Sequence, residues 1–172
     1  MDANRGGARR TLAPAVLLAI LLAAAVAPAP PAAAGQPPRA AGGGTVAEGG
    51  ERSTVAFNAV RHRDGTVTGH LVYHYRAGDA SVHLDVDCLD VAGTRAVLGG
   101  RVAKVSGDLP PFITEGLEAV FQVEDNGEGA GAPPDRVSDL LFLVFDRTGD
   151  CHTLAPETPP RRPLRGNVDV RP

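Results

Sequence analysis

Three histidines and two aspartates in neighbouring stretches of the chain are the side chains best suited to chemistry. They are His70, His74, His83, Asp85 and Asp87. Both stretches alternate apolar and polar residues, so a hairpin of Leu71–Tyr75 and Val82–Cys88 would place all five side chains on one outer face. Cross-strand neighbours lie about 5 Å apart, close enough to share a metal ion or to let a carboxylate tune an imidazole. The face is a candidate metal or acid–base site.

The register of the hairpin sets which side chains of this face are neighbours. With residues 76–81 as the loop, His74 lies opposite His83 and His70 lies opposite Asp87. The simpler interpretation is an ordinary polar sheet surface, on which a histidine beside an aspartate gains a little from charge. The residues fit both interpretations, and no motif in the chain predicts a cofactor.

An acidic loop is the second candidate site. Its oxygen-bearing residues are Asp125, Asn126 and Glu128, with Asp135 further along the chain. Carboxylate and amide oxygens suit calcium, although their spacing does not match the calcium loop of an EF-hand. A turn is the favoured interpretation, because Asn-Gly dipeptides supply a positive φ and Asp125 can accept a hydrogen bond from its own backbone.

The motifs of common enzymes are missing from the sequence. It has no G-x-S-x-G turn, no H-E-x-x-H helix, no phosphate-binding Gly-rich loop and no dinucleotide-binding fingerprint. The absence of tryptophan also weighs against a carbohydrate cleft. We therefore expect no enzymatic activity. The alternative is a small metal-dependent hydrolytic enzyme, or a calcium- or zinc-binding domain, that uses the residues above.

The N-terminal 34 residues have the organisation of a signal peptide. Arg5, Arg9 and Arg10 precede an apolar stretch, and small residues lead to a predicted cleavage after Ala34. The apolar stretch is shorter and more broken than the run of about 20 residues that a membrane helix needs. The sequence thus predicts a secreted, extracellular protein without a membrane span in its mature form.

Two cysteines occur in the chain, Cys88 and Cys151. An even number of cysteines in an exported protein predicts a disulfide bond. A metal-binding pair and a reactive thiol are the alternatives, and the lack of a C-x-x-C spacing makes the zinc signal weak.

Composition suggests the domain organisation and the kind of partner. Residues 35–50 are rich in Gly, Pro and Ala and predict a flexible linker, with a first short strand near Thr45-Val46 as the alternative, followed by a domain over 51–172 that could begin near residue 43. The chain has a formal net charge of −3, and Lys104 is its only lysine. Such an acidic chain is a poor partner for nucleic acid. The expected partner is an extracellular or cell-envelope ligand or protein.

Apolar and polar residues alternate with a period of two over much of the domain, which is typical of half-buried antiparallel strands. The strand candidates are residues 54–59, 70–75, 82–88, 96–105, 117–123, 137–145 and 167–170. Gly99-Gly100 predicts a bulge or bend, and the continuously apolar 137–145 predicts a strand buried on both faces. About seven short strands separated by turns predict an all-β, immunoglobulin-like antiparallel β-sandwich.

Several segments also match a known pattern in the same order along the chain. They are Gly42–Val46, Phe57–Ala59, Thr68–Leu71, Tyr73-His74, Val91–Ala96, Gly99-Gly100, Phe121–Gly129, Pro133–Arg136 and Gly166–Val170. Together they cover nearly the whole predicted domain, which resembles the post-COAP-1 domain, a small extracellular β-domain of secreted actinobacterial proteins. The resemblance implies a secreted sandwich with no catalytic residues to carry over. We expect a non-catalytic binding or accessory module.

Overall fold

The computed structural model describes residues 35–48, 51–75, 79–143, 151 and 160–172. These belong to one compact unit, Ala34–Pro172. The predicted signal peptide and its cleavage after Ala34 lie outside the described residues. Over the part of the chain that is described, no helix is long and apolar enough to cross a membrane.

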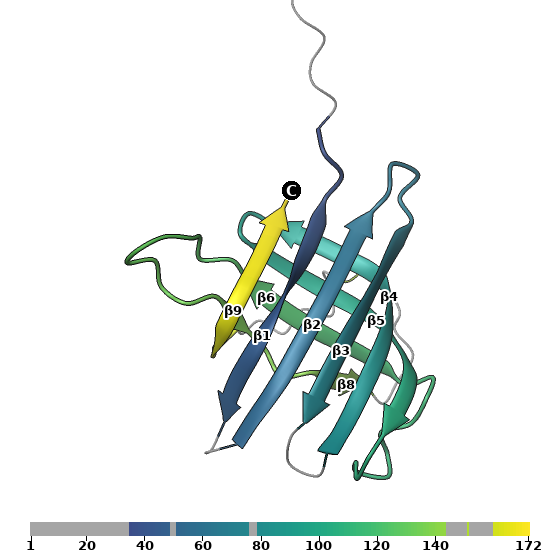
Figure 1. The fold of residues 1–172 in the computed structure, drawn as a ribbon. Helices are drawn as coiled ribbons and strands as arrows, with labels where there is room; N and C mark the ends of the chain where they lie inside the picture. Colours follow the sequence, from purple (N-terminus) through teal and green to yellow (C-terminus); the bar gives the residue numbers. More distant parts are fainter. Residues whose placement is uncertain (1–34, 49–50, 76–78, 144–150, 152–159) are drawn as a thin grey trace, which may run out of the picture. The chain divides into compact units, whose positions relative to one another are not determined.

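Nine strands make up the described structure (Figure 1). They are β1 (Arg39–Glu48), β2 (Glu51–Arg61), β3 (Val67–Tyr75), β4 (Ala80–Ala92), β5 (Arg95–Ser106), β6 (Glu118–Glu124), β7 (Arg136–Val137), β8 (Leu141–Leu143) and β9 (Arg162–Arg171). Strands β1 to β6 pair with their neighbours in chain order, and all pairings are antiparallel. From β1 to β5 this order follows from short connections, because a tight turn joins antiparallel strands directly, whereas residues 107–117 separate β5 from β6.

The sheet closes on itself into an eight-stranded antiparallel barrel. Strand β9 pairs with β1 on one side and with β7 on the other, β7 pairs with β6, and β6 pairs with β5. Strand β8 lies next to β7 on the same edge of β6. The predicted all-β antiparallel class is confirmed, but the immunoglobulin-like sandwich is replaced by the barrel. Alternating burial is the same in both folds, because each strand turns one face inward in either case.

Two β-bulges let the long β4–β5 hairpin bend from one side of the barrel to the other. Figure 1 shows β9, β1, β2 and β3 in front, with β6 and β8 running across behind them. Asp87 is the extra residue in β4, opposite Gly99-Gly100, and a second irregularity leaves Ala103 unmatched in β5. The bulge predicted at Gly99-Gly100 is therefore present, although the extra residue belongs to the partner strand. An extra residue increases the local bend and twist, which helps a sheet to close.

The interior of the barrel is filled by side chains. Phe57, Tyr73 and Phe121 pack edge to face, with ring centroids 5.7 Å apart for Phe57–Phe121 and 6.4 Å for Tyr73–Phe121. Leu71 and Leu98 are fully buried beside them in the same apolar cluster. The inward residues predicted from alternation on β2, β3 and β6 thus form the core. A closed barrel of eight strands is just wide enough for such filling.

Strand β1 lies where the sequence predicted a flexible linker. It pairs with β2 along its whole length and with β9 from Arg39 to Val46. The glycines that suggested a linker are needed for close approach: a Cβ on Gly42 would lie 3.0 Å from the Phe57 ring, and one on Gly44 would lie 2.5 Å from the Arg165 carbonyl oxygen. Glycine here serves packing between strands, a reading that composition alone does not distinguish from flexibility.

Substitution of Gly44 tests the close packing of β1 against β9. We expect Gly44→Ala to lower the free energy of unfolding by about 1–3 kcal/mol, because the methyl group meets backbone atoms of β9 that must move. Urea unfolding measures the loss. Gly35→Ala is the matched control, since nothing lies within 4 Å of its Cβ position. Equal stability of the two variants would show that β1 is not held against β9.

The C-terminal strands also differ from expectation. The sequence predicts one strand over 137–145 that is buried on both faces, whereas the structure has the short β7 and β8 on either side of Ser138 to Leu140, with the Leu141 side chain exposed. Residues 144–145 of this prediction lie outside the described residues. Strand β9 begins at Arg162, earlier than the predicted 167–170. Hydrogen bonds from Arg171 and Arg39 hold Asp169 of β9 and lower the pKa of its carboxyl, which also ties β9 to β1.

Candidate functional site

The histidine and aspartate face is present, but its residues do not form the predicted cluster. His70 lies opposite Asp85 instead of Asp87, and His74 lies opposite Ser81 instead of His83. The register differs from the prediction by two residues, and β4 begins at Ala80. A shift of two keeps every side chain on its predicted face, so the alternation pattern cannot distinguish the two registers.

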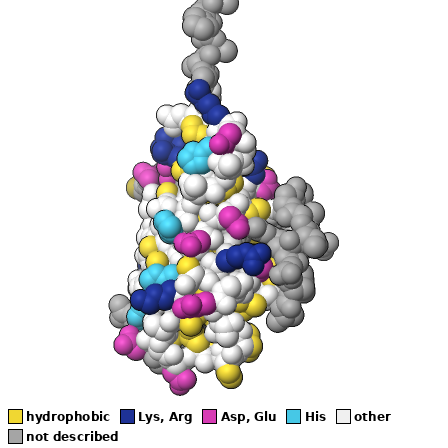
Figure 2. All heavy atoms as spheres, turned by 90° about the vertical axis from the view of Figure 1, so that its right-hand side faces the viewer, with side chains coloured by type: hydrophobic (Ala, Val, Ile, Leu, Met, Phe, Trp, Pro, Cys, Tyr) yellow, Lys and Arg dark blue, Asp and Glu magenta, His cyan; other side chains and the backbone are white. Residues whose placement is uncertain are grey.

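The remaining members of the face are separated by the same register. His83 lies between Val72 on β3 and Lys104 on β5, and Asp87 is the extra residue of the bulge. Figure 2 shows cationic, anionic and histidine side chains interspersed on the side of the molecule that is at the right in Figure 1. The arrangement is that of a mixed polar surface.

Two histidine–aspartate pairs do form on this surface. His70 Nδ1 lies 3.3 Å from Asp85 Oδ1, with both side chains more than two-thirds exposed, and His74 Nε2 lies 3.2 Å from Asp79 Oδ1. Exposed pairs of this kind are worth about 0–1 kcal/mol. Among the residues that the structure describes, no three His, Cys, Asp or Glu side chains are placed to hold a metal ion.

This geometry predicts the response to metals. We expect that adding zinc, calcium or a chelator leaves the melting temperature unchanged, because a pair of exposed ligands binds a divalent ion weakly and stabilisation follows occupancy. Differential scanning fluorimetry of the protein, with and without each ion, measures this. A rise in melting temperature that is lost in the His70→Ala variant would contradict the prediction and support a metal site on this face.

The acidic loop forms a turn and is anchored to β9. Gly127 has a φ of +82°, and its N–H donates to Asp125 Oδ1 over 2.8 Å, as the turn interpretation predicts. Asp125 Oδ2 accepts from the Val170 N–H at 3.1 Å. One carboxylate thus shapes the loop and attaches it to the barrel, which leaves it poorly available to an ion.

Asp135 is the second anchor of the loop and is almost fully buried. Its Oδ1 accepts from the Asn126 N–H at 2.8 Å, and its Oδ2 accepts from the Val168 N–H at 2.7 Å. Its backbone carbonyl accepts from the Leu164 N–H at 2.8 Å. Asn126 itself donates through its side chain to the Pro134 carbonyl. The loop therefore has a defined shape against β9.

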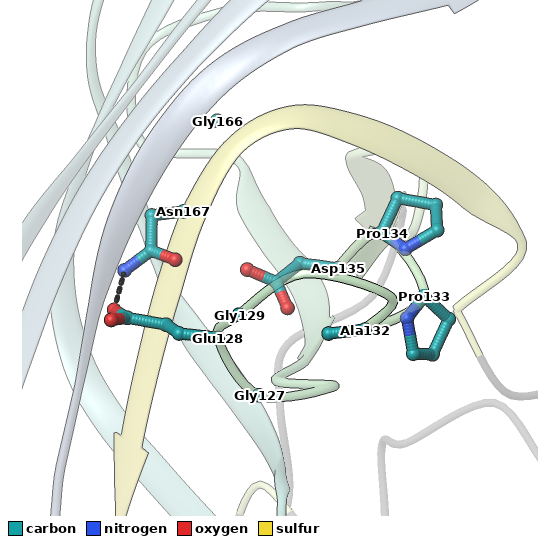
Figure 3. Close-up of a pocket in the computed structure, with 9 residues that line it drawn as sticks. All are labelled: Gly127, Glu128, Gly129, Ala132, Pro133, Pro134, Asp135, Gly166 and Asn167. Carbon is teal, nitrogen blue, oxygen red and sulfur yellow. Dashed lines mark hydrogen bonds between the residues drawn. The ribbon is translucent and has the colours of Figure 1, made fainter.

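An open pocket of about 300 Å³ lies between this loop and β9 (Figure 3). Its lining residues are Gly127, Glu128, Gly129, Ala132, Pro133, Pro134, Asp135, Gly166 and Asn167. Asn167 Nδ2 donates to Glu128 Oε1 over 3.0 Å, which joins the two sides of the pocket. In Figure 3 Asp135 points toward this pair, and the two proline rings lie on the opposite side. Both charged residues of the lining are carboxylates.

Sequence reasoning found part of this pocket. Glu128 belongs to the predicted acidic loop, with Asp135 further along the chain, whereas the sequence connects Gly166 and Asn167 only with the end of the domain. The signal that could have joined them is the pair of aspartates in the loop, because carboxylates accept hydrogen bonds from the backbone N–H groups of an uncovered strand edge. Their proximity depends on closure of the barrel.

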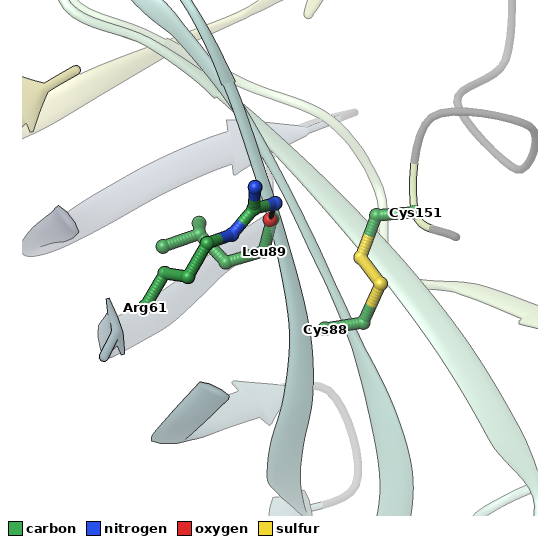
Figure 4. The surroundings of a disulfide bond; sticks show 4 residues. All are labelled: Arg61, Cys88, Leu89 and Cys151. Carbon is green, nitrogen blue, oxygen red and sulfur yellow. Dashed lines mark hydrogen bonds between the residues drawn. A yellow bond between two sulfur atoms is a disulfide. The ribbon is translucent and has the colours of Figure 1, made fainter. Parts of the chain in front are cut away.

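The disulfide between Cys88 and Cys151 lies on another part of the barrel (Figure 4). The bulge at Asp87 turns Cys88 outward and Leu89 into the core, which reverses the inward position that uninterrupted alternation predicts for Cys88. Figure 4 shows the disulfide and the Leu89 side chain on opposite sides of β4. Arg61 of β2 donates to the Leu89 carbonyl oxygen.

No protein-family model, curated protein or solved structure matches this chain.

Proposed function

We propose that the chain is a secreted, non-catalytic β-module with a binding or accessory role, and that the pocket between the acidic loop and β9 is its binding site. Its partner is an extracellular or cell-envelope ligand or protein. The relation to the post-COAP-1 domain belongs to the same proposal, as does export by the N-terminal signal peptide.

The pocket is the observation that carries this proposal. The apolar core fills the barrel around Phe57, Tyr73 and Phe121, so binding within the barrel would require the core to repack. The pocket, in contrast, is open, polar and held in shape by the buried Asp135. A loop held on a rigid scaffold is the common arrangement of a binding site.

The histidine and aspartate face supports the alternative of a small metal-dependent hydrolytic enzyme less well. Catalytic zinc sites take three protein ligands and keep one position open. In the described part of this face, His70 pairs with Asp85 and His74 pairs with Asp79, at different positions along β3. Each pair supplies two ligands instead of three.

The backbone amides of the pocket glycines can report ligand binding by NMR, which tests the proposal. Three pocket residues, Gly127, Gly129 and Gly166, are glycines, whereas Gly65 and Gly93 lie in other turns. We expect culture fluid or solubilised cell-envelope fractions to shift or broaden the NMR amide signals of the three pocket glycines in the ¹⁵N-labelled exported protein. The signals of Gly65 and Gly93 should stay in place. Changes confined to other surfaces, or none with any fraction, would overturn the proposal.

A further inference from the structure

The pocket lies on an edge of β9 that no strand fully covers. Strand β7 pairs only with Arg162 and Pro163, at the beginning of β9. Beyond that point the backbone N–H groups of alternate residues face away from β1, as antiparallel pairing requires. An uncovered edge of this kind exposes backbone donors and acceptors to any extended chain.

The loop covers this edge at three positions and leaves one open. The N–H groups of Leu164, Val168 and Val170 donate to the Asp135 carbonyl, the Asp135 carboxylate and the Asp125 carboxylate. Gly166 occupies the same alternating series, between Leu164 and Val168. It is exposed and lines the pocket, and its N–H donates to no acceptor among the described residues.

We propose that the pocket binds an extended peptide segment that pairs with Gly166 and places a Lys or Arg side chain against Glu128. This rests on the proposed binding role of the pocket and names its ligand class. A ligand carbonyl accepts from the Gly166 N–H, and a ligand N–H donates to the Gly166 carbonyl. Strand addition of this type draws affinity from main-chain hydrogen bonds and specificity from side-chain contacts.

Charge and size both favour such a ligand. The lining contains Glu128 and Asp135 and no Lys or Arg, so a cation is attracted and an anion is repelled. Asn167 already donates to Glu128 Oε1, which holds that carboxylate beside β9 at the edge of the pocket, and Glu128 Oε2 accepts from no donor among the described residues. The volume of about 300 Å³ is at the lower end of the range for small-ligand sites and suits a few residues of peptide.

Selection from a library of random hexapeptides displayed on phage, with the exported protein as bait, tests the inference. We expect the selected peptides to contain a basic residue and, as synthetic peptides, to shift the Gly166 amide signal. N-methylation of the peptide nitrogen that faces Gly166 should weaken binding about tenfold, because it removes one main-chain hydrogen bond to a partly exposed site. Glu128→Gln should also weaken binding about tenfold. Glu115→Gln, an exposed carboxylate outside the pocket, should have no effect.

The outcomes separate this inference from the proposed function. Peptides that bind in the pocket but tolerate N-methylation at every position, with the Gly166 signal unmoved, would overturn strand pairing and leave the pocket as a binding site. Failure to enrich basic peptides would overturn the ligand class, while fraction-induced shifts of Gly127 and Gly129 would still support the proposed function. Peptide binding at another surface together with unmoved pocket glycines would overturn both.

Discussion

Replacing Cys88 and Cys151 together by serine should lower the free energy of unfolding by about 4 kcal/mol. The disulfide joins residues 63 positions apart with a Cα–Cα distance of 5.7 Å. In the chain-entropy model a crosslink closing a loop of this length removes about that much conformational freedom from the unfolded chain. Cys151 is also fully buried, so its removal disturbs packing on the outside of β4.

Thermal and urea unfolding measure the effect of the double variant. For a domain of this size a loss of about 4 kcal/mol lowers the melting temperature by roughly 10 °C or more. Reduction of the unmodified protein should lower it to a similar extent, and the same reductant should leave the Cys88→Ser/Cys151→Ser variant unaffected. A loss below about 1 kcal/mol would show that the crosslink does not constrain the unfolded chain as this model assumes.

Asp135→Ala has the second largest expected effect, a loss of about 3–5 kcal/mol in the free energy of unfolding. The carboxylate accepts hydrogen bonds from the backbone N–H groups of Asn126 and Val168 and is only 5% exposed. Hydrogen bonds to a charged group are worth about 1.5–3 kcal/mol each, and removal of the acceptor leaves buried donors without a partner. The loop should therefore separate from β9.

Hydrogen exchange identifies the cause of this loss. In Asp135→Ala the hydrogen-exchange rate of the Val168 amide should rise by more than the loss of global stability explains. The exchange rates of amides in β2 and β3 should rise only as far as the loss of global stability requires. Asp135→Asn keeps one acceptor oxygen and should lose roughly half as much stability. Glu128→Gln is the matched control, because it changes an exposed carboxylate of the same loop. If the Asp135→Ala variant were as stable as this control, the Asp135 carboxylate would not anchor the loop to β9.

Alternation predicted which residues of the strands face the core. Val55, Phe57 and Ala59 are buried as expected, and so are Leu71 and Tyr73. This information is local, because successive side chains of a strand point to opposite faces whatever the strand pairs with. The pattern could not set the register of β3 on β4, since a slip of two residues preserves both faces. The predicted cluster around His70 depended on that register and is not formed.

The face of Cys88 shows where a local rule fails. One extra residue, Asp87, interrupts the alternation in β4 and turns Cys88 outward, where it bonds Cys151. The sequence marked the bulge only through Gly99-Gly100 on the partner strand. A bulge is a property of two paired strands, and a pattern read along one strand does not say which of them carries the extra residue.

The amino-acid sequence by itself determined the all-β class, the inward faces of most strands and the two cysteines available for a crosslink, because these follow from local alternation and residue type. Only the tertiary structure decided that β1 is a strand over its full length from Arg39 to Glu48, that the sheet closes into a barrel, and that Asp135 and Gly166 meet beside one pocket. These features depend on pairing between segments far apart in the chain. The hydrogen bonds of β9 to β1 and to Asp135 form only when the first and last strands come together.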